Sequence, residues 1–296
     1  LDPSYRIFEK KQHTDIPAGY ESLKKLFEKI EIGSSKKLDA FLKEAAYKYE
    51  TGIKKLVFKP GLSLFEFADA SLIAGIFRLD VFNSVKSHVK KFFGHPFLQQ
   101  LIEFPVLFLG ALAENIPALY TLMNYADIKG GTWYPQGGMY KIAEAMYSLA
   151  NELGVLFHFD EEVKKIVVTD KKAGHIVTKD KAGCIKTYEA DVVIGGADYH
   201  HIETALLQPQ HRTYSDAYWE KRVMAPGCLL YYIGINKKLK NLQHHNLFFD
   251  ASFEVHGKEI YTTKTWPSDP LFYACVPSVT DETVAPAGCE NLFLLI

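Results

Sequence analysis

The sequence is poor in cysteine, and its cysteines form no recognisable pattern. Cys184, Cys228, Cys275 and Cys289 are scattered, and none belongs to a C-x-x-C pair. This spacing suggests neither a zinc motif nor a disulfide framework. A reduced environment, the cytoplasm, is the default expectation for such a chain.

Long hydrophobic runs are also missing. The most apolar stretch, 105–113, is far shorter than the roughly 20 residues that a membrane-spanning helix needs. The chain opens with no signal-peptide pattern either. We therefore expect a protein without membrane-spanning segments.

The chain has no excess of charge of one sign and none of the familiar nucleotide-binding motifs. Lys and Arg number 34 against 35 Asp and Glu, a balance that argues against a nucleic-acid-binding protein. G-x-G-x-x-G, Walker A and G-x-S-x-G are absent, so the chain lacks the usual cradle for a pyrophosphate. Aromatic residues, in contrast, make up 14% of the chain. They hint at an apolar ligand, although a large core gives the same count.

Hydrophobic periodicity predicts helices first and strands afterwards. Helical spacing marks 23–30, 38–49, 83–93, 95–109 and 115–127, and an apolar stripe marks 139–153 before Gly154. Strands are predicted at 155–159, 163–168, 174–178, 184–189, 191–194, 228–235, 245–249, 271–276 and 291–296, with a short helix over 199–207 that Asp198 would cap. This order predicts an α+β fold with a mixed or antiparallel sheet, divided into a mainly helical region 1–129 and a sheet-rich region 130–296. Because the last strand ends the chain as a bare apolar run, we expect a piece of a longer protein.

Two histidine pairs, His200-His201 and His244-His245, invite a metal hypothesis. Adjacent residues in a strand point to opposite faces, and no H-x-x-x-H pattern completes a site. We therefore predict surface or polar-core roles for both pairs and no metal site.

Two glycine-containing segments carry more information. In 130–139 four glycines bracket Trp133, Tyr134 and Pro135 directly before a helix, which would suit stacking against a flat ligand or simply a tight turn. In 191–198 an apolar run enters Gly195-Gly196-Ala197 and Asp198, a junction that in many α/β proteins lies against a cofactor. Each segment alone is weak evidence.

Taken in order, these segments resemble the phytoene desaturase family, the bacterial-type carotenoid desaturases among the amine-oxidase-like flavoproteins. The resemblance rests on motifs at 131–138, 154–155, 163–166, 190–198, 230–236, 244–249 and 277–289. It covers 130–289, whereas 1–129 adds little. It implies the substrate-binding part of an FAD-linked oxidoreductase, without the Rossmann βαβ unit that lies N-terminal to this region in the family. Such a piece would be inactive alone.

The resemblance also implies site residues. Val163 would present backbone to the adenine of FAD, and Gly195, Gly196 and Ala197 would pass close to its diphosphate. Trp133, Tyr134, Pro135, Gly137 and Gly138 would lie near the flavin ring and the tunnel for a long apolar isoprenoid or carotenoid.

No catalytic acid or base is assigned, because in this chemistry the flavin accepts the hydride. For Asp198 and Asp281 a cap or turn role is favoured. The related flavoprotein activities of a retinoid saturase or polyene isomerase would show the same motifs. An apolar-ligand or membrane-binding module without catalytic activity is the alternative of another class.

A bilayer-dissolved substrate implies contact with the inner face of a membrane. Lys86, Lys90 and Lys91 beside Phe92, Phe93 and Phe97 could form a basic-aromatic surface. An ordinary helix with a solvated lysine face and buried phenylalanines is the favoured interpretation.

Overall fold

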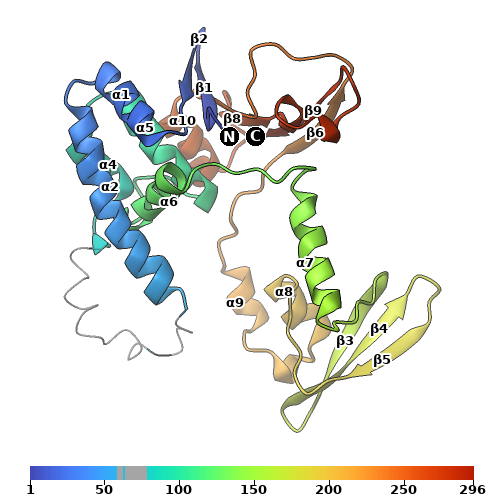
Figure 1. Cartoon of the computed structure of the whole chain (residues 1–296). Helices are drawn as coiled ribbons and strands as arrows, with labels where there is room; N and C mark the ends of the chain where they lie inside the picture. Colours follow the sequence, from blue (N-terminus) through green and yellow to red (C-terminus); the bar gives the residue numbers. More distant parts are fainter. Residues whose placement is uncertain (59–62, 64–78) are drawn as a thin grey trace. The chain divides into compact units, whose positions relative to one another are not determined.

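The computed structural model describes residues 1–58, 63 and 79–296 (Figure 1). These residues form two compact units: unit 1 comprises Leu1–Ala143 and Pro226–Ile296, and unit 2 comprises Glu144–Ala225. Residues 59–62 and 64–78 of the predicted helical region lie outside the described residues. The predicted division at residue 130 separates regions by secondary-structure content, and as a domain boundary it stays a prediction.

Helices fill most of the N-terminal part of unit 1, as predicted. They are α1 (Tyr20–Ile30), α2 (Ser34–Thr51), η1 (Gly52–Leu56), α4 (Val85–Phe92), α5 (Pro96–Glu103), η3 (Phe104–Leu109), η4 (Ala118–Thr121) and α6 (Leu122–Gly130). Local sequence sets the boundaries: the Ser84 hydroxyl accepts a hydrogen bond from the Ser87 N–H at the start of α4. The single helix predicted over 95–109 ends as a 3-10 helix, because Pro105 has no N–H to continue an α-helical ladder.

Phenylalanines form the centre of the helical core. Phe27, Phe41 and Phe93 are fully buried, and the ring of Phe93 lies 5.5 Å from Phe27 and 5.9 Å from Phe41 in edge-to-face contacts. Phe97 is also buried, while the Lys86 ammonium reaches Glu114 at 2.9 Å. Lys90 and Lys91 are exposed and Phe92 is half-buried, so the segment agrees with the favoured interpretation at Phe93, Phe97 and these two lysines.

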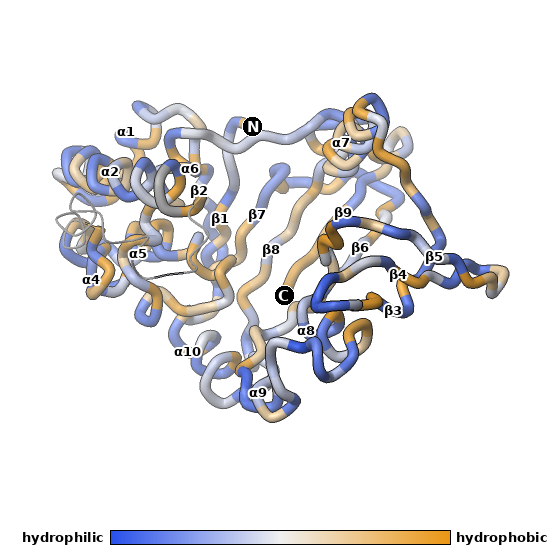
Figure 2. Tube along the Cα trace, turned by 90° about the horizontal axis from the view of Figure 1, so that it is seen from below, coloured by the Kyte–Doolittle hydropathy of each residue, from blue (hydrophilic) through white to orange (hydrophobic). Residues whose placement is uncertain are grey.

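A mixed six-stranded sheet completes unit 1. Its strands are β1 (Tyr5–Glu9), β2 (Gln12–Ile16), β6 (Leu230–Ile235), β7 (His245–Phe248), β8 (Phe272–Cys275) and β9 (Glu290–Leu295), in the order β2-β1-β7-β8-β9-β6. β1 and β7 are parallel and the other pairs antiparallel, which confirms the predicted α+β class with a mixed sheet. β8 is mostly hydrophobic, whereas β1 and β7 mix hydrophobic and polar residues (Figure 2). Short elements join the later strands: α10 (Phe253–Gly257), η7 (Lys258–Thr263), η8 (Pro277–Val279) and η9 (Glu282–Val284).

Strands β1 and β2 were not predicted. Tyr5, Arg6 and Ile7 are all buried in succession. β1 contains the polar residues Arg6 and Glu9, and β2 is polar except for Ile16, so neither segment has the apolar run that marks a strand in the sequence.

Unit 2 contains most of α7 (Tyr140–Glu152) and an antiparallel sheet in the order β3-β4-β5. Its remaining elements are β3 (Glu161–Thr169), β4 (Lys172–Asp180), β5 (Ile185–Glu189), α8 (Tyr199–His201), η5 (Ile202–Leu206), η6 (Pro209–His211) and α9 (Asp216–Glu220). Gly154 adopts φ +83° just after α7, as a helix-ending glycine does. The Asp198 carboxylate accepts a hydrogen bond from the His201 N–H at 2.8 Å, which confirms its cap role.

The strands predicted at 155–159 and 191–194 are wrong. Within the described residues neither segment joins a ladder, and a strand exists only where a neighbour pairs with its N–H and C=O groups. Their apolar side chains are instead exposed, among them Leu156 at 83% and Ile194 at 89%. The apolar stripe of α7 is likewise exposed, with no buried residue along the helix.

Candidate functional site

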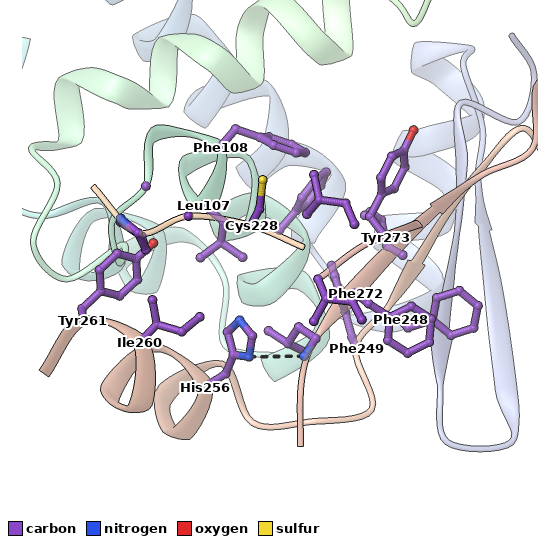
Figure 3. Close-up of a pocket in the computed structure, with 18 residues that line it drawn as sticks. Leu107, Phe108, Cys228, Phe248, Phe249, His256, Ile260, Tyr261, Phe272 and Tyr273 are labelled. Atoms are coloured by element: carbon purple, nitrogen blue, oxygen red, sulfur yellow. Dashed lines mark hydrogen bonds between the residues drawn. The ribbon is translucent and has the colours of Figure 1, made fainter. Parts of the chain in front are cut away.

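Unit 1 contains an apolar cavity of about 320 Å³, here called the sheet cavity (Figure 3). Strands β7, β8 and β9, the helices η3 and η7, and the segment 226–228 supply its walls. It is lined by Phe104, Leu107, Phe108, Gly110, Pro226, Gly227, Cys228, Leu247, Phe248, Phe249, His256, Ile260, Tyr261, Leu271, Phe272, Tyr273, Leu295 and Ile296. A lining so rich in aromatic and aliphatic side chains suits a hydrocarbon.

A second apolar cavity of about 540 Å³, the helix cavity, also lies in unit 1. It is lined by Tyr5, Tyr49, Ile53, Phe104, Pro105, Phe108, Leu122, Met123, Ala126, Asp127, Thr132, His245, Leu247 and Tyr273. Helices α2 and α6 thus contribute to it together with the edge of η3 and strands β1, β7 and β8.

The two cavities share Phe104, Phe108, Leu247 and Tyr273, so they are neighbours that meet at these four residues, the common wall. Phe104 is held in this wall by edge-to-face contact with Tyr5 at 5.4 Å. Phe108, in contrast, is 66% exposed although it lines both cavities. An exposed wall residue gains buried area when an apolar ligand covers it.

Few polar groups line these cavities. Two of them, His256 and Asp127, form hydrogen bonds within the protein. In the sheet cavity the Leu271 N–H donates to His256 Nδ1 at 3.3 Å, and burial lowers the pKa of His256, which favours the neutral ring (Figure 3). In the helix cavity burial raises the pKa of Asp127, and its partner is the Tyr5 hydroxyl. In both groups burial favours the neutral form.

The predicted aromatic turn forms, but the residues predicted to contact substrate line neither the sheet cavity nor the helix cavity. Trp133 is 85% exposed, and its indole N–H donates to the Gly130 carbonyl at 2.8 Å. Gly137 and Gly138 have φ +86° and +98°, which explains why glycine occupies both positions. Of this segment, Thr132 lines the helix cavity. Substrate contacts by Trp133, Tyr134, Pro135, Gly137 and Gly138 therefore stay a prediction.

Asp281 anchors this turn to the sheet region. Its carboxylate accepts hydrogen bonds from the Gly137 N–H at 2.7 Å and the Tyr134 hydroxyl at 3.2 Å, and it caps η9 through the Thr283 N–H. Hydrogen bonds from Thr283 and then Gly137 lower the pKa of Asp281 to about 2. The structure thus confirms a turn and cap role for Asp281.

His244 and His245 lie beside the turn. The Tyr134 ring centroid is 4.5 Å from that of His244, and the two histidine rings are 4.5 Å apart. The two rings do not point to opposite faces of a strand as predicted, because β7 begins at His245 and strand alternation does not extend to His244.

The residues predicted to contact the cofactor belong to unit 2. Val163 lies on β3 at an irregularity of the β3–β4 pairing, and Gly195, Gly196 and Ala197 are exposed. A Cβ on Gly195 would lie 2.6 Å from Ile202 Cδ1, whereas one on Gly196 would point into open space. Open backbone at Gly196 leaves room for the close approach of a flat or anionic group. Contact of Val163, Gly195, Gly196 and Ala197 with a cofactor stays a prediction.

Unit 1 combines a mixed sheet, helices and two apolar cavities, and unit 2 presents a glycine turn with exposed backbone. These features define an α+β protein. The chain belongs to the flavin containing amine oxidoreductase family, whose pattern matches residues 4–276.

Curated relatives confirm the resemblance to the phytoene desaturase family. A carotenoid 3,4-desaturase of Haloarcula japonica is 35% identical across the whole of this chain and 59% of its own length. A zeta-carotene-forming phytoene desaturase of Myxococcus xanthus is 29% identical across the whole chain and 56% of its own length. The chain thus spans somewhat over half the length of these relatives.

Solved structures agree on the fold. An oxidoreductase from Methanosarcina mazei matches 79% of this chain and 52% of its own with a TM-score of 0.51 at 19% identity. A Pyrococcus furiosus protein matches 99% of this chain and 58% of its own with a TM-score of 0.57 at 13% identity. Among the described residues, no helix has the length and apolar character to cross a membrane.

Proposed function

We propose that this chain forms the substrate-binding part of an FAD-dependent oxidoreductase that introduces double bonds into a long apolar isoprenoid or carotenoid. The observation that carries the proposal is the pair of apolar cavities with a common wall at Phe104, Phe108, Leu247 and Tyr273. Relatives named carotenoid and phytoene desaturases support the same substrate class.

The cavity walls fit this task because a polyene offers nothing for a polar group to bind. Aromatic side chains supply broad apolar surface, and Phe248 stacks between Phe8 at 4.7 Å and Phe272 at 4.1 Å across three strands. This stacking holds the sheet wall rigid. A rigid, water-excluding wall positions a hydrocarbon without a specific hydrogen bond.

Redox chemistry requires a cofactor, since no side chain accepts a hydride. A bound flavin supplies that acceptor. Val163, Gly195, Gly196 and Ala197 are the residues that we propose for contact with FAD, on the support of the exposed glycine turn. The chain's own residues bind and orient the hydrocarbon and exclude water, and no side chain is assigned as a catalytic acid or base.

Unit 2 exposes apolar side chains that another surface could cover. Leu149 and Leu153 of the α7 end, Leu156 and Phe159 are all more than half exposed. Surface of this kind commonly marks an interaction site. Contact of the protein with a bilayer, from which the substrate would enter, is part of the proposal.

The test is production of the gene product that carries this chain in a host that accumulates an acyclic carotenoid precursor. A desaturase yields a product that has lost two hydrogen atoms for each new double bond, as seen by mass spectrometry and a red-shifted absorption spectrum. An isomer of unchanged mass would point to a polyene isomerase, and an added pair of hydrogens to a saturase. Unchanged precursor despite bound FAD would refute oxidoreductase activity on this substrate class.

A further inference from the structure

Two histidines and a cysteine converge beside the helix cavity. His245 of β7 and Cys275 of β8 are directly paired in the antiparallel register, so their side chains share a face of the sheet. His244 completes the group, and the three residues each have one ligand atom within 4.8 Å of the others. Two imidazoles and one thiol are a donor set that Zn²⁺ prefers.

Hydroxyl groups hold both imidazoles in place. His244 Nδ1 lies 2.6 Å from Thr280 Oγ1, and His245 Nδ1 lies 2.5 Å from the Tyr273 hydroxyl. The Thr280 hydroxyl also donates to the Pro277 carbonyl at 3.3 Å, so it accepts from His244 Nδ1–H. Metal-binding histidines characteristically have their second ring nitrogen fixed by an oxygen in this way.

We propose that His244, His245 and Cys275 form a binding site for a divalent, borderline-soft metal ion, with Zn²⁺ as the physiological candidate. Three protein ligands leave the fourth position of a tetrahedral ion open. His245 and Tyr273 also line the helix cavity. An ion at this site would therefore lie at the wall of the helix cavity, where water would take its open position. This proposal does not depend on the redox activity proposed above.

The test is titration of the full 296-residue chain, freed of metal, with Co²⁺ alone and then with Zn²⁺. We expect one Co²⁺ per chain, a thiolate-to-cobalt charge-transfer band, and loss of the band when Zn²⁺ displaces Co²⁺. Cys275→Ser should abolish the band and weaken metal affinity more than about tenfold, since loss of an outer partner alone costs 10–100-fold. Cys184→Ser removes an exposed cysteine of unit 2 and is the matched control that should leave the titration unchanged.

A second measurement on the unaltered chain makes the result independent of how the variants fold. Zn²⁺ should slow alkylation of Cys275 at least about tenfold, followed by peptide mass spectrometry, and leave Cys184 as reactive as before. Absence of a charge-transfer band together with unprotected Cys275 would overturn the proposal. A band that survives in folded Cys275→Ser would overturn it as well.

Discussion

Phe108 offers the sharpest test of the apolar cavities, because it lines both of them while most of its surface is exposed. In the free chain 66% of Phe108 is accessible to solvent, and its ring contacts Phe104 at 6.1 Å. A polyene that occupies the cavities would cover this surface. Phe108→Ala should therefore weaken polyene binding more than it weakens the fold.

The expected loss of polyene affinity follows from the exposed fraction of the Phe108 side chain. Full burial of a phenylalanine side chain contributes about 1.5–3 kcal/mol, so covering the exposed two thirds contributes about 1–2 kcal/mol. At about 1.4 kcal/mol for each factor of ten, Phe108→Ala should raise the dissociation constant roughly 5- to 30-fold. The third that is already buried limits the loss of folding stability to about 0.5–1 kcal/mol.

The assay is titration of the chain with a long acyclic polyene in mixed micelles, followed by the shift of the polyene absorption and its induced circular dichroism. Phe82→Ala is the matched control, since Phe82 is 80% exposed and lines neither cavity. Equal affinities of the Phe108→Ala, Phe82→Ala and unaltered chains would refute the assignment of these cavities as the polyene site.

Three further predictions concern the fold and the turn. Phe41→Ala, at a fully buried position, should lower the free energy of unfolding by about 3–5 kcal/mol in urea titration; a loss under about 1 kcal/mol would contradict the helical core. Asp281→Asn should flatten the dependence of stability on acid pH. The fold lowers the pKa of Asp281 from 3.8 to about 2, so the carboxylate stabilises the native state above about pH 4. This contribution disappears as the pH falls toward 2. Thermal unfolding of both chains from pH 5 to 2 measures it, and parallel curves would contradict it. Asp198→Ala should cost about 0.5–2 kcal/mol of stability through loss of the cap, and an unchanged unfolding midpoint would argue against the hydrogen bond to His201.

Local patterns in the sequence predicted much of the fold. The apolar stripe and Gly154 marked α7, and short β-type runs between turn-forming segments marked β3, β4 and β5, because these signals lie within a few consecutive residues. Pairing between distant segments has no local signature. No local pattern therefore predicted β1, because its parallel partner β7 lies some 240 residues further along the chain. It also predicted strands at 155–159 and 191–194 that find no neighbour within the described residues.

The candidate site was less accessible to sequence reasoning than the fold. The aromatic surplus indicated an apolar ligand, but Phe108, Leu247 and Tyr273 are distinguished from core residues only by facing a cavity. The His244–His245–Cys275 cluster was missed for a similar reason. Thirty residues separate His245 from Cys275, and only the β7–β8 register brings them opposite each other.

The central claim, flavin-dependent dehydrogenation of a polyene bound in unit 1, is tested most directly by anaerobic mixing. The gene product that carries this chain, reconstituted with FAD, would be mixed with an acyclic polyene while the flavin's visible absorption is followed. The account predicts bleaching of the flavin in step with formation of a more conjugated product, slowed by Phe108→Ala at limiting polyene. A fully bound flavin that stays oxidised while the polyene occupies its site would contradict it.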